Sequence, residues 1–394
     1  MAKVGPLDGI RVVELTNWMA GPSAAAALAD MGADVIKIEP LTGDTARKMS
    51  RPVRLQPDGA EIDAGFTMDN RGKRSVAVSI DKPEGADLVR RLVARADILL
   101  CNLLPQRQTK FGLDPETLFK VRPGLVHATL TGYGLKGPDS WRPGFDVTAF
   151  FGRAAITESL TDVGAQAPQP RPAQGDHTTA LALLSAILAA LRVAEKTGEG
   201  QIVDVSLMGA ATWTMATDLA PVLVDGREPS KRDRDHRLAA LATSHRCSDD
   251  RFIILNMTEP RWWPRVCERL EHPEWVEDER FVTPRARLQN MPELTRLLDA
   301  AFITNTLAEW GRLFDESGLI WGPAQTLGEL AVDPQTIAAG LFPEVETTEG
   351  PIRTVALPMH IDGAEIRPRG PAPAIGQHTL EVLRQAGVPD EEIF

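Results

Sequence analysis

The stretch IRVVELTNWMAGPSAAAALADMGADVIKIE, residues 10–39, predicts the fold of the chain better than any other segment. Ile10–Leu15 is rich in β-branched residues and suits a buried strand, and Asp34–Glu39 is a second run of this kind. Between them, a Gly-Pro pair lets a helix begin, and the alanine-rich segment Ser23–Met31 favours a helix by propensity. A strand, a helix and a second strand in this order predict an α/β unit.

The same alternation continues along the chain. We expect further strands at Ser75–Ile80, Asp97–Cys101, Leu125–Leu130 and Gln201–Ser206, and long helices at Pro83–Arg95 and Thr178–Lys196. Strands that alternate with helices predict a parallel sheet with helices packed on it. The fold class is therefore α/β, with a large Rossmann-like parallel-sheet domain over residues 1–224.

The composition of the chain changes after Asp225. The stretch Asp225–Arg237 carries many charges of both signs and is typical of an exposed connection. A short strand is expected at Phe252–Asn256, followed by helices at Arg261–Leu270 and Pro292–Phe314. Because four tryptophans also fall in this region, we expect a smaller α+β domain with its own core at residues 225–330. The remaining segment, residues 331–394, is rich in proline and glycine until a last helix at Thr379–Ala386.

Composition and charge exclude several classes of protein. The chain has 394 residues and a formal net charge of −11, whereas a general nucleic-acid binder needs a basic surface. No basic segment leads into an apolar one near residue 1, so we expect no signal peptide. The longest apolar run, Thr179–Ala190, is shorter than the roughly 20 residues that span a bilayer. Three scattered cysteines, none in a CxxC pair, favour a reducing compartment and no metal site. We expect a cytoplasmic protein with no nucleic-acid partner and no membrane span.

A nicotinamide cofactor is one alternative for the first βα unit. Glu39 lies about where a carboxylate would bind a ribose hydroxyl. The turn after the first strand holds only Gly21, however, and not the G-x-G-x-x-G that brings the backbone against a pyrophosphate. A generic α/β opening explains this segment better.

A basic cluster and two strand ends are candidate ligand sites. The segment Asn70–Ser75 (NRGKRS) contains three cations and is either a solvated turn or a seat for phosphates. Asn102 follows one predicted strand, and Gly132-Tyr133-Gly134 follows the next. Ligands bind at the carboxyl ends of strands in open α/β sheets, although asparagine and glycine also occur in ordinary turns.

Asp176 stands immediately before the long apolar helix. One interpretation is an N-cap, in which the carboxylate accepts backbone N–H groups at the start of a helix. The other is a carboxylate nucleophile that the helix amides keep ionised near neutral pH. His177 next to it is a possible base.

The order of short motifs along the chain resembles the family III CoA-transferases of the CaiB/BaiF type, together with their α-methylacyl-CoA racemase relatives. No single motif decides this resemblance, which rests on their shared order over most of the chain. The motifs are Gly5-Pro6-Leu7-x-Gly9-Ile10-x-Val12, Ala20-Gly21-Pro22, Gly32–Glu39, Asn70-x-x-Lys73-Arg74-Ser75, Gly132-Tyr133-Gly134 with Gly137-Pro138, Gly175-Asp176, Lys196-Thr197-Gly198-x-Gly200-Gln201, Gly322-Pro323, Asp333-Pro334-Gln335 and Gly376-x-His378-Thr379.

The resemblance implies a fold and a reaction. Residues 331–394 would return to the large domain, and two chains would interlace as rings in a homodimer. The chain would be an enzyme that moves CoA from an acyl-CoA to a carboxylic acid. Asp176, which matches the nucleophile of the family, would form an aspartyl mixed anhydride and then an aspartyl-CoA thioester. CoA would be a co-substrate, and no cofactor would be tightly bound.

The resemblance also implies residues that bind CoA. These are Met19 and Ala20 after the first strand, Val78 and Ile80 in the third, and Asn102, Gly132 and Tyr133. Lys110 stands where formyl-CoA transferases have an arginine, and lysine cannot make the bidentate phosphate contact. Pro40 replaces another arginine that contacts phosphate, and we expect Arg71 or Arg74 to compensate.

Three departures from the family pattern bear on the reaction. Phe145 stands where the racemases have a catalytic histidine, and without that base racemisation is disfavoured. Residues 238–245 lack the glycine-rich loop of formyl-CoA transferases. Trp18 and Met19 replace smaller or more polar residues, which suggests an apolar acyl group. Two alternatives remain open at this point: an acyl-CoA racemase or isomerase on the same scaffold, and a CoA-binding protein without turnover.

Overall fold

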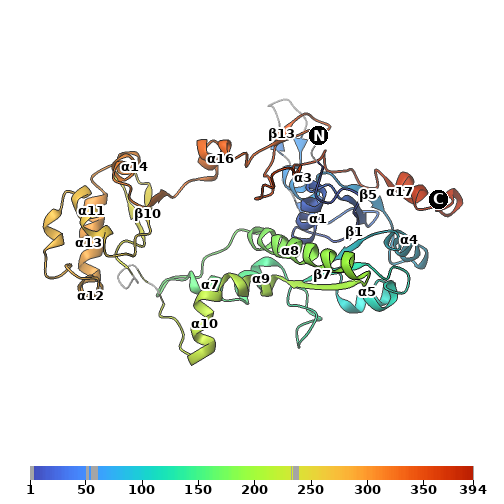
Figure 1. Ribbon diagram of the computed structural model, residues 1–394, viewed down its shortest axis with the longest axis horizontal. Coiled ribbons are helices and arrows are strands. Elements are labelled where there is room, and N and C mark those ends of the chain that lie inside the picture. Colours follow the sequence, from blue (N-terminus) through green and yellow to red (C-terminus); the bar gives the residue numbers. More distant parts are fainter. Residues whose placement is uncertain (1–3, 50–52, 55–60, 232, 234–238, 394) are drawn as a thin grey trace. The chain divides into compact units, whose positions relative to one another are not determined.

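The computed structural model describes residues 4–49, 53–54, 61–231, 233 and 239–393 of the chain. The predicted connection Asp225–Arg237 lies partly outside these residues. The chain forms two compact units (Figure 1). The larger unit comprises residues 1–158, 169–227 and 334–394, and the smaller unit comprises residues 159–168 and 228–333.

A six-stranded sheet forms the centre of the larger unit, and all of its neighbouring strands are parallel. The strand order is β5 (Arg74–Ala77), β2 (Asp34–Glu39), β1 (Arg11–Leu15), β6 (Ile98–Cys101), β7 (Val126–Thr131) and β8 (Gln201–Ser206). This is the order of a Rossmann-like doubly wound sheet, so the predicted α/β class is confirmed. The strand order reverses between β1 and β6, and a ligand site is expected at such a point.

Helices and short strand pairs complete the larger unit. The helices are α1 (Ala20–Asp30), α2 (Ala46–Met49), α3 (Ala64–Asn70), α4 (Pro83–Val93), α5 (Pro105–Phe111), α6 (Pro115–Leu118), the π-helix η1 (Asp146–Gly152), α7 (Ile156–Ser159), α8 (Gln174–Thr197), α9 (Leu207–Thr214), α10 (Ala216–Asp225), α16 (Pro334–Ala338), α17 (Thr379–Gln385) and α18 (Asp390–Ile393). The strand pairs are β3 (Val53–Arg54) with β4 (Glu61–Ile62), and β12 (Glu344–Val345) with β13 (Ile352–Arg353).

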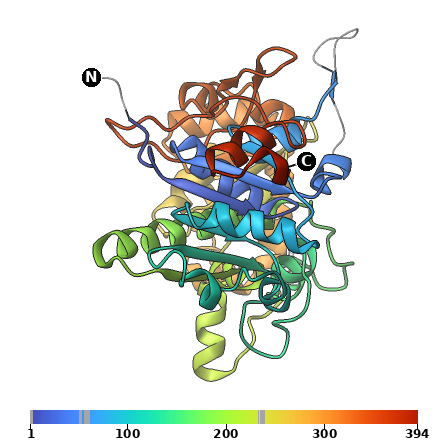
Figure 2. The same cartoon turned by 90° about the vertical axis from the view of Figure 1, so that its right-hand side faces the viewer.

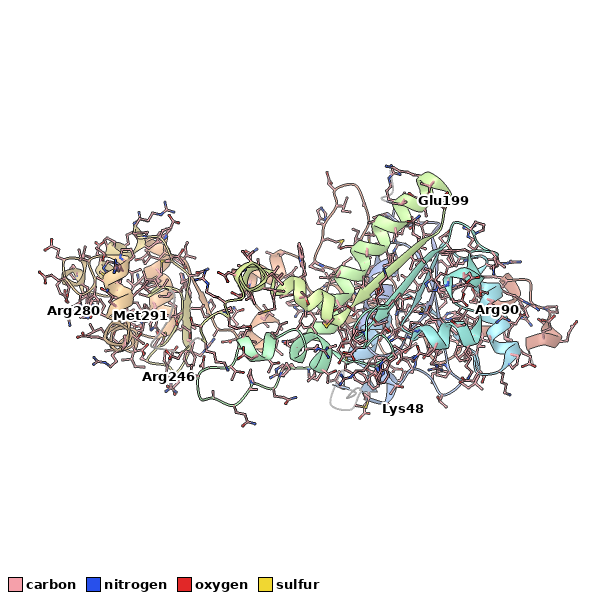
Figure 3. All side chains as sticks on the ribbon, turned by 90° about the horizontal axis from the view of Figure 1, so that it is seen from below. Lys48, Arg90, Glu199, Arg246, Arg280 and Met291 are labelled. Atoms are coloured by element: carbon pink, nitrogen blue, oxygen red, sulfur yellow. The ribbon has the colours of Figure 1, made fainter. Side chains whose placement is uncertain are left out.

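The helix α8 is the main core helix of this unit. Among the helices in the described residues, α8 is the one that, taken singly, is long and apolar enough to cross a membrane. Its side chains Thr179, Leu183 and Ile187, spaced four apart, are fully buried against the same core as β7 and α1. The helix can be followed in Figure 3 to Glu199, which lies in the turn after its C-terminal end.

The C-terminal segment lies against the outer strand of the sheet. In Figure 2 the red helices α17 and α18 lie next to the light-blue helix α4. The amide of Ser75 donates a hydrogen bond of 3.2 Å to Nδ1 of His378, and the amide of Ala77 donates one of 3.0 Å to Oγ1 of Thr379. These bonds satisfy donors that β5 would otherwise expose at the sheet edge.

The smaller unit packs helices against a three-stranded antiparallel sheet of β11 (Trp321–Pro323), β10 (Phe252–Leu255) and β9 (Ser244–Arg246). Its helices are α11 (Trp262–Arg269), the 3₁₀ helix η2 (Pro273–Val276), α12 (Pro284–Gln289), α13 (Met291–Phe302), α14 (Leu307–Glu316) and α15 (Leu327–Leu330). Figure 3 labels Arg246, Arg280 and Met291 in this unit. Trp263, Trp275 and Trp310 are buried in its own core, apart from that of the larger unit.

The prediction of one long helix in the smaller unit is wrong. The chain forms α13 and α14 instead of a single helix at Pro292–Phe314. The hydroxyl of Thr306 accepts the amide of Glu309, and the Glu309 carboxylate accepts the amide of Thr306. This capping box starts a new helix, because it satisfies amides that have no acceptor within the helix.

Candidate active site

A cavity of about 320 Å³ opens at the carboxyl ends of β1, β6 and β7, where the strand order reverses. Loops after these three strands and the start of α8 form its wall. The lining residues that matter below are Trp18, Asn102, Arg107, Gly132, Phe145 and Asp176. The cavity therefore brings Asp176 together with several of the residues expected to bind CoA.

Asn102 ties the loops after β1 and β6 together. Its side-chain amide donates a hydrogen bond of 2.9 Å to the carbonyl of Asn17, and its Oδ1 accepts the amide of Asn17 at 3.3 Å. Both polar ends of the Asn102 side chain are thus used to hold the floor of the cavity. A side-chain amide can donate and accept a hydrogen bond at the same time, so asparagine at this position can hold the backbone of Asn17.

Trp18 has an unusual backbone conformation at the edge of the cavity. Its φ is 72°, which few residues other than glycine adopt and which is strained for a bulky residue. Its amide donates a hydrogen bond of 3.2 Å to Oδ1 of Asp44. The buried ammonium of Lys37 lies 2.9 Å from the other oxygen of Asp44 and donates to the carbonyl of Thr16 at 3.1 Å. A buried ion cluster therefore fixes the loop on which Trp18 stands.

Asp176 lies in the first turn of α8 and does not cap it. The helix begins at Gln174, and Ala173 precedes it with a φ of 78° and no capping side chain. The N-cap interpretation is therefore wrong. Burial, reinforced by the nearby carboxylate of Asp146, raises the pKa of Asp176 to about 7. Helix amides are expected from the sequence to keep this group ionised near neutral pH, whereas burial leaves it only partly ionised there.

Asp146 is a second carboxylate beside the nucleophile candidate. It begins the π-helix η1 and is only 3% exposed. Its Oδ1 accepts the amide of Val147 at 2.7 Å, and its Oδ2 has no hydrogen-bond partner among the described residues. A Cβ atom at Gly175 would come within 2.9 Å of the Cβ of Asp146, so this position in the first turn of α8 requires glycine. The turn that carries Asp176 thus packs directly on Asp146.

His177 points to a third carboxylate. Its Nε2 lies 3.0 Å from Oδ1 of Asp69, which also accepts the hydroxyl of Ser23 at 2.5 Å. The bond to Asp69 and the carboxylates of Asp176 and Asp146 raise the pKa of His177 above its ordinary value. A protonated His177 in turn lowers the pKa of Asp176, against the effect of burial.

The expected CoA-binding residues fall into two groups. Ala20, Asn102 and Gly132 line the cavity. Met19 immediately precedes α1 and is half-buried, and Tyr133 is buried in the core of the larger unit. Lys110 is exposed on α5, 3.9 Å from Asp81.

Val78 and Ile80 are also set apart from the cavity. Both follow β5, which ends at Ala77 and is separated from β1 by β2. Val78 is buried, and Ile80 is half-buried against the same core.

Arg71 and Arg74 occupy ion pairs away from the cavity. The guanidinium of Arg71 is buried and donates to Asp30 at 2.6 Å and to the carbonyl of Met68 at 2.6 Å. The guanidinium of Arg74 donates to Asp34 at 2.7 Å. A phosphate would have to displace these carboxylates, so the expected compensation for the missing phosphate arginine is not provided by these side chains in the structure.

Arg107 lines the cavity and was not among the expected residues. It is on α5, one helical turn before Lys110, and its guanidinium lies 3.8 Å from Asp81. Arg107 precedes Lys110 by three residues, and two helical residues at this spacing lie on the same face. This spacing from a predicted phosphate ligand could have identified Arg107 from the sequence.

Gly132 allows a close approach of two segments. A Cβ at this position would lie 2.8 Å from the Cα of Gly144 and 3.0 Å from its amide nitrogen. The positive φ expected of turn glycines occurs instead at Gly134, where it is 95°. Gly132 therefore positions Gly144 and Phe145 at the cavity wall.

Comparisons with known proteins identify the family of the chain. A family model described as CoA-transferase family III matches residues 7–379. The chain belongs to CoA-transferase family III. It is 32% identical over 389 residues to the (R)-2-hydroxy-4-methylpentanoate CoA-transferase of Clostridioides difficile, covering 98% of this chain and 97% of that one. It is 33% identical over 385 residues to the succinate–glutarate CoA-transferase of Agrobacterium fabrum, covering 96% and 95%.

A solved structure matches the fold as well. The CaiB/BaiF family protein from Brucella suis superposes with a TM-score of 0.86 at 29% identity, covering 98% of this chain and 100% of that one. Family III CoA-transferases are soluble enzymes that use CoA thioesters, and α8 is accordingly a core helix of one of them. No group of three His, Cys, Asp or Glu side chains that could hold a metal ion occurs within the described ranges.

Proposed function

We propose that this family III enzyme transfers CoA from an acyl-CoA to a carboxylic acid, with Asp176 as the nucleophile. The observation that carries the proposal is the position of Asp176, at the wall of the cavity where the strand order reverses. Its raised pKa, about 7, leaves an ionised fraction at neutral pH and makes the carboxylate a better nucleophile than an ordinary aspartate.

The reaction consists of two exchanges, each run forward and back. The Asp176 carboxylate attacks the thioester carbonyl, which forms a mixed anhydride and releases the CoA thiolate. The thiolate then attacks the aspartyl carbonyl, which releases the donor acid and leaves an aspartyl-CoA thioester. An acceptor carboxylate attacks this thioester, which forms a second mixed anhydride and releases the CoA thiolate. The thiolate then attacks the acceptor carbonyl of that anhydride, which gives the new acyl-CoA and restores the Asp176 carboxylate. The thioester energy is conserved in every step.

Backbone amides at the start of α8 support these steps. The first amides of a helix have no acceptor within it, and Asp176 lies in that first turn. Amides of this kind stabilise the oxyanion of a tetrahedral intermediate, an effect worth about 3–4 kcal/mol per donor. Asn102, Ala20 and Gly132 would contact the CoA arm, and the cations Arg107 and Lys110 would attract its phosphates.

We also propose that the enzyme is a cytoplasmic homodimer. The apolar side chains Trp213, Leu223 and Val224 on α9 and α10 are 83%, 76% and 88% exposed. A second copy of the chain would bury such a surface, because monomers rarely expose apolar residues in groups. The side chain of Phe145 has no group that transfers protons, which favours a transferase over a racemase.

Intact-protein mass spectrometry tests the proposal. Wild type, Asp176→Ala and the exposed control Asp362→Ala would be mixed with a panel of acyl-CoAs, and hydroxylamine would trap activated carboxylates. We expect a mass shift in wild type and in the control that is absent from Asp176→Ala. If no donor gives an adduct while CoA still binds, the nucleophilic role of Asp176 is refuted.

A further inference from the structure

Two aromatic rings form an apolar corner in the wall of the cavity. The rings of Trp18 and Phe145 are 5.2 Å apart between centroids and almost perpendicular, with an interplanar angle of 86°. Edge-to-face contact of this kind is favourable and holds both rings in place. The two residues are far apart in sequence, so the corner exists only in the folded chain. We call this pair the aromatic corner.

The protein holds Trp18 in a costly conformation. A bulky residue with a φ of 72° is stable only where its surroundings fix it, and such strain concentrates at functional sites. Here the fixing contacts come from Asp44 and, through it, from the buried ammonium of Lys37. The backbone of Trp18 is therefore held in place at the cavity wall.

Phe145 stands beside the reacting carboxylate. It directly precedes Asp146, whose side chain packs against Gly175, the residue before Asp176. The hydroxyl of Thr148 accepts the amide of Phe145 at 3.1 Å, which fixes the start of η1. Although it lines the cavity and contacts Trp18, Phe145 is 52% exposed, so part of its surface is open to a ligand in the cavity that Asp176 also lines.

The cavity wall offers little to a second carboxylate. Among the described residues that line it, Arg107 and Asp176 are the charged ones. Arg107 is on α5 at the end of β6, whereas Phe145 follows β7 and packs with η1 beside α8. A carboxylate placed against the two rings of the aromatic corner would lose part of its hydration, and Arg107 is the one cation among the described lining residues that could offset this cost.

We propose that the aromatic corner binds the carbon chain of the acyl group and selects acids with a phenyl or branched apolar group over dicarboxylic acids. This inference rests on the proposed function, because it assumes that the acyl carbonyl meets Asp176. An apolar chain extending from that carbonyl would cover the exposed face of Phe145 and contact Trp18. Recognition would operate on donor and acceptor alike, since each forms a mixed anhydride with Asp176 in the same cavity.

The adenine base of CoA is the other flat apolar group that could occupy the corner. A purine stacks best between or upon parallel faces, whereas these rings meet edge to face. The pantetheine arm also separates the adenine from the thioester, and the corner stands beside the carboxylate that attacks the thioester. The acyl group is therefore the better occupant.

Donor specificity of the full-length enzyme tests the inference. The value of kcat/KM would be measured with 3-phenylpropionyl-CoA, 4-methylpentanoyl-CoA, succinyl-CoA and acetyl-CoA, using one common acceptor acid. Wild type is expected to prefer the first two donors. Phe145→Leu and Trp18→Leu are each expected to lower kcat/KM for the phenyl donor about tenfold or more, with less change for acetyl-CoA. Trp141→Leu makes the same change at a tryptophan that is 61% exposed and does not line the cavity, and it should leave the preference unchanged.

Three results would overturn the inference. The first is a preference of wild type for succinyl-CoA that Arg107→Gln removes. The second is an equal loss with every donor in Phe145→Leu, which would make the residue merely structural. The third is weaker binding of free CoA to Phe145→Leu by calorimetry, which would assign the corner to the nucleotide. Failure of the proposed function is distinguishable, because then no donor would react at all.

Discussion

The buried carboxylate of Asp146 lies next to Asp176 and adds to the rise that burial causes in the pKa of Asp176. Oδ2 of Asp146 has no hydrogen-bond partner among the residues that the structure describes. No donor at that oxygen among these residues therefore weakens the effect of its negative charge on Asp176. In the proposed reaction, the anhydride and the thioester both remove the negative charge of Asp176. Formation of either therefore relieves the repulsion between the two carboxylates, and Asp146 favours the covalent intermediates over the free enzyme.

Asp146→Asn should move the acid limb of the pH profile. Activity needs ionised Asp176 and therefore falls as the pH drops through its pKa, about 7 in the wild type. Without the charge of Asp146 that pKa falls, so the limb of kcat/KM against pH should move to lower pH.

His177→Gln provides the opposite change for the same measurement. A protonated His177 lowers the pKa of Asp176, so its removal should move the limb to higher pH. Limbs that shift in the same direction in both variants would contradict this account of the site.

Asp176→Asn should stabilise the fold at alkaline pH. The pKa of Asp176 is raised from 3.8 to about 7, so the folded state binds a proton that the unfolded state has lost at the pH values between them. Ionised Asp176 therefore costs stability above pH 7, and this cost declines as the pH falls toward 4. Urea unfolding at pH 8 should give the variant a free energy of unfolding about 2–4 kcal/mol larger than that of wild type. A gain that does not shrink between pH 8 and pH 5 would show a different cause.

Lys73→Met should destabilise the larger unit strongly. The ammonium of Lys73 is buried, lies 2.8 Å from Glu14 and donates to the carbonyl of Pro22 at 2.9 Å. Its loss leaves Glu14 without one of its counter-charges in the interior, which costs about 3–5 kcal/mol. Arg312→Ala breaks an exposed ion pair with Glu316 and should cost less than about 1 kcal/mol in the same unfolding experiment. Equal effects of the two variants would contradict the importance of the buried cluster.

Gly132→Ala should impair catalysis more than folding. The added methyl group would push the backbone of Gly144 away, and Phe145 would move with it. Displacement of a substrate-contacting segment by a fraction of an ångström lowers kcat/KM about tenfold or more. Gly328→Ala is the matched control, since its nearest neighbour atom would be 3.9 Å away. Wild-type kinetics in Gly132→Ala would mean that the approach of Gly132 to Gly144 does not position Phe145.

Local patterns predicted much of the larger unit. The runs at β1 and β2 are rich in β-branched residues and are buried after their first residue, and such runs favour a strand. The start of α8 was misplaced because Asp176 resembles a cap, whereas Ala173 adopts a positive φ and lets the helix begin earlier. The break before α14 carried a readable signal, since Thr306 and Glu309 form the spacing of a capping box.

The site was only partly predictable from the sequence. The strand ends placed Asn102 and Gly132 correctly at the cavity, because parallel strands end at one edge of a sheet. The basic cluster was less informative. The carboxylates that neutralise Arg71 and Arg74 stand about 40 residues earlier in the chain, and only the register of the fold brings them together. The pKa of Asp176 likewise depends in part on Asp146, and the sequence does not show that these two residues lie close together.

The hydrogen bonds between β5 and the segment around His378 span about 300 residues of chain, and the smaller unit is formed within that interval. During synthesis, the outer edge of the sheet therefore stays uncovered until nearly the whole protein has left the ribosome. Contacts this distant form late and slowly, and an open strand edge pairs readily with other chains in the meantime. A messenger truncated shortly before His378 would thus yield a chain with an intact cavity wall whose principal defect is aggregation.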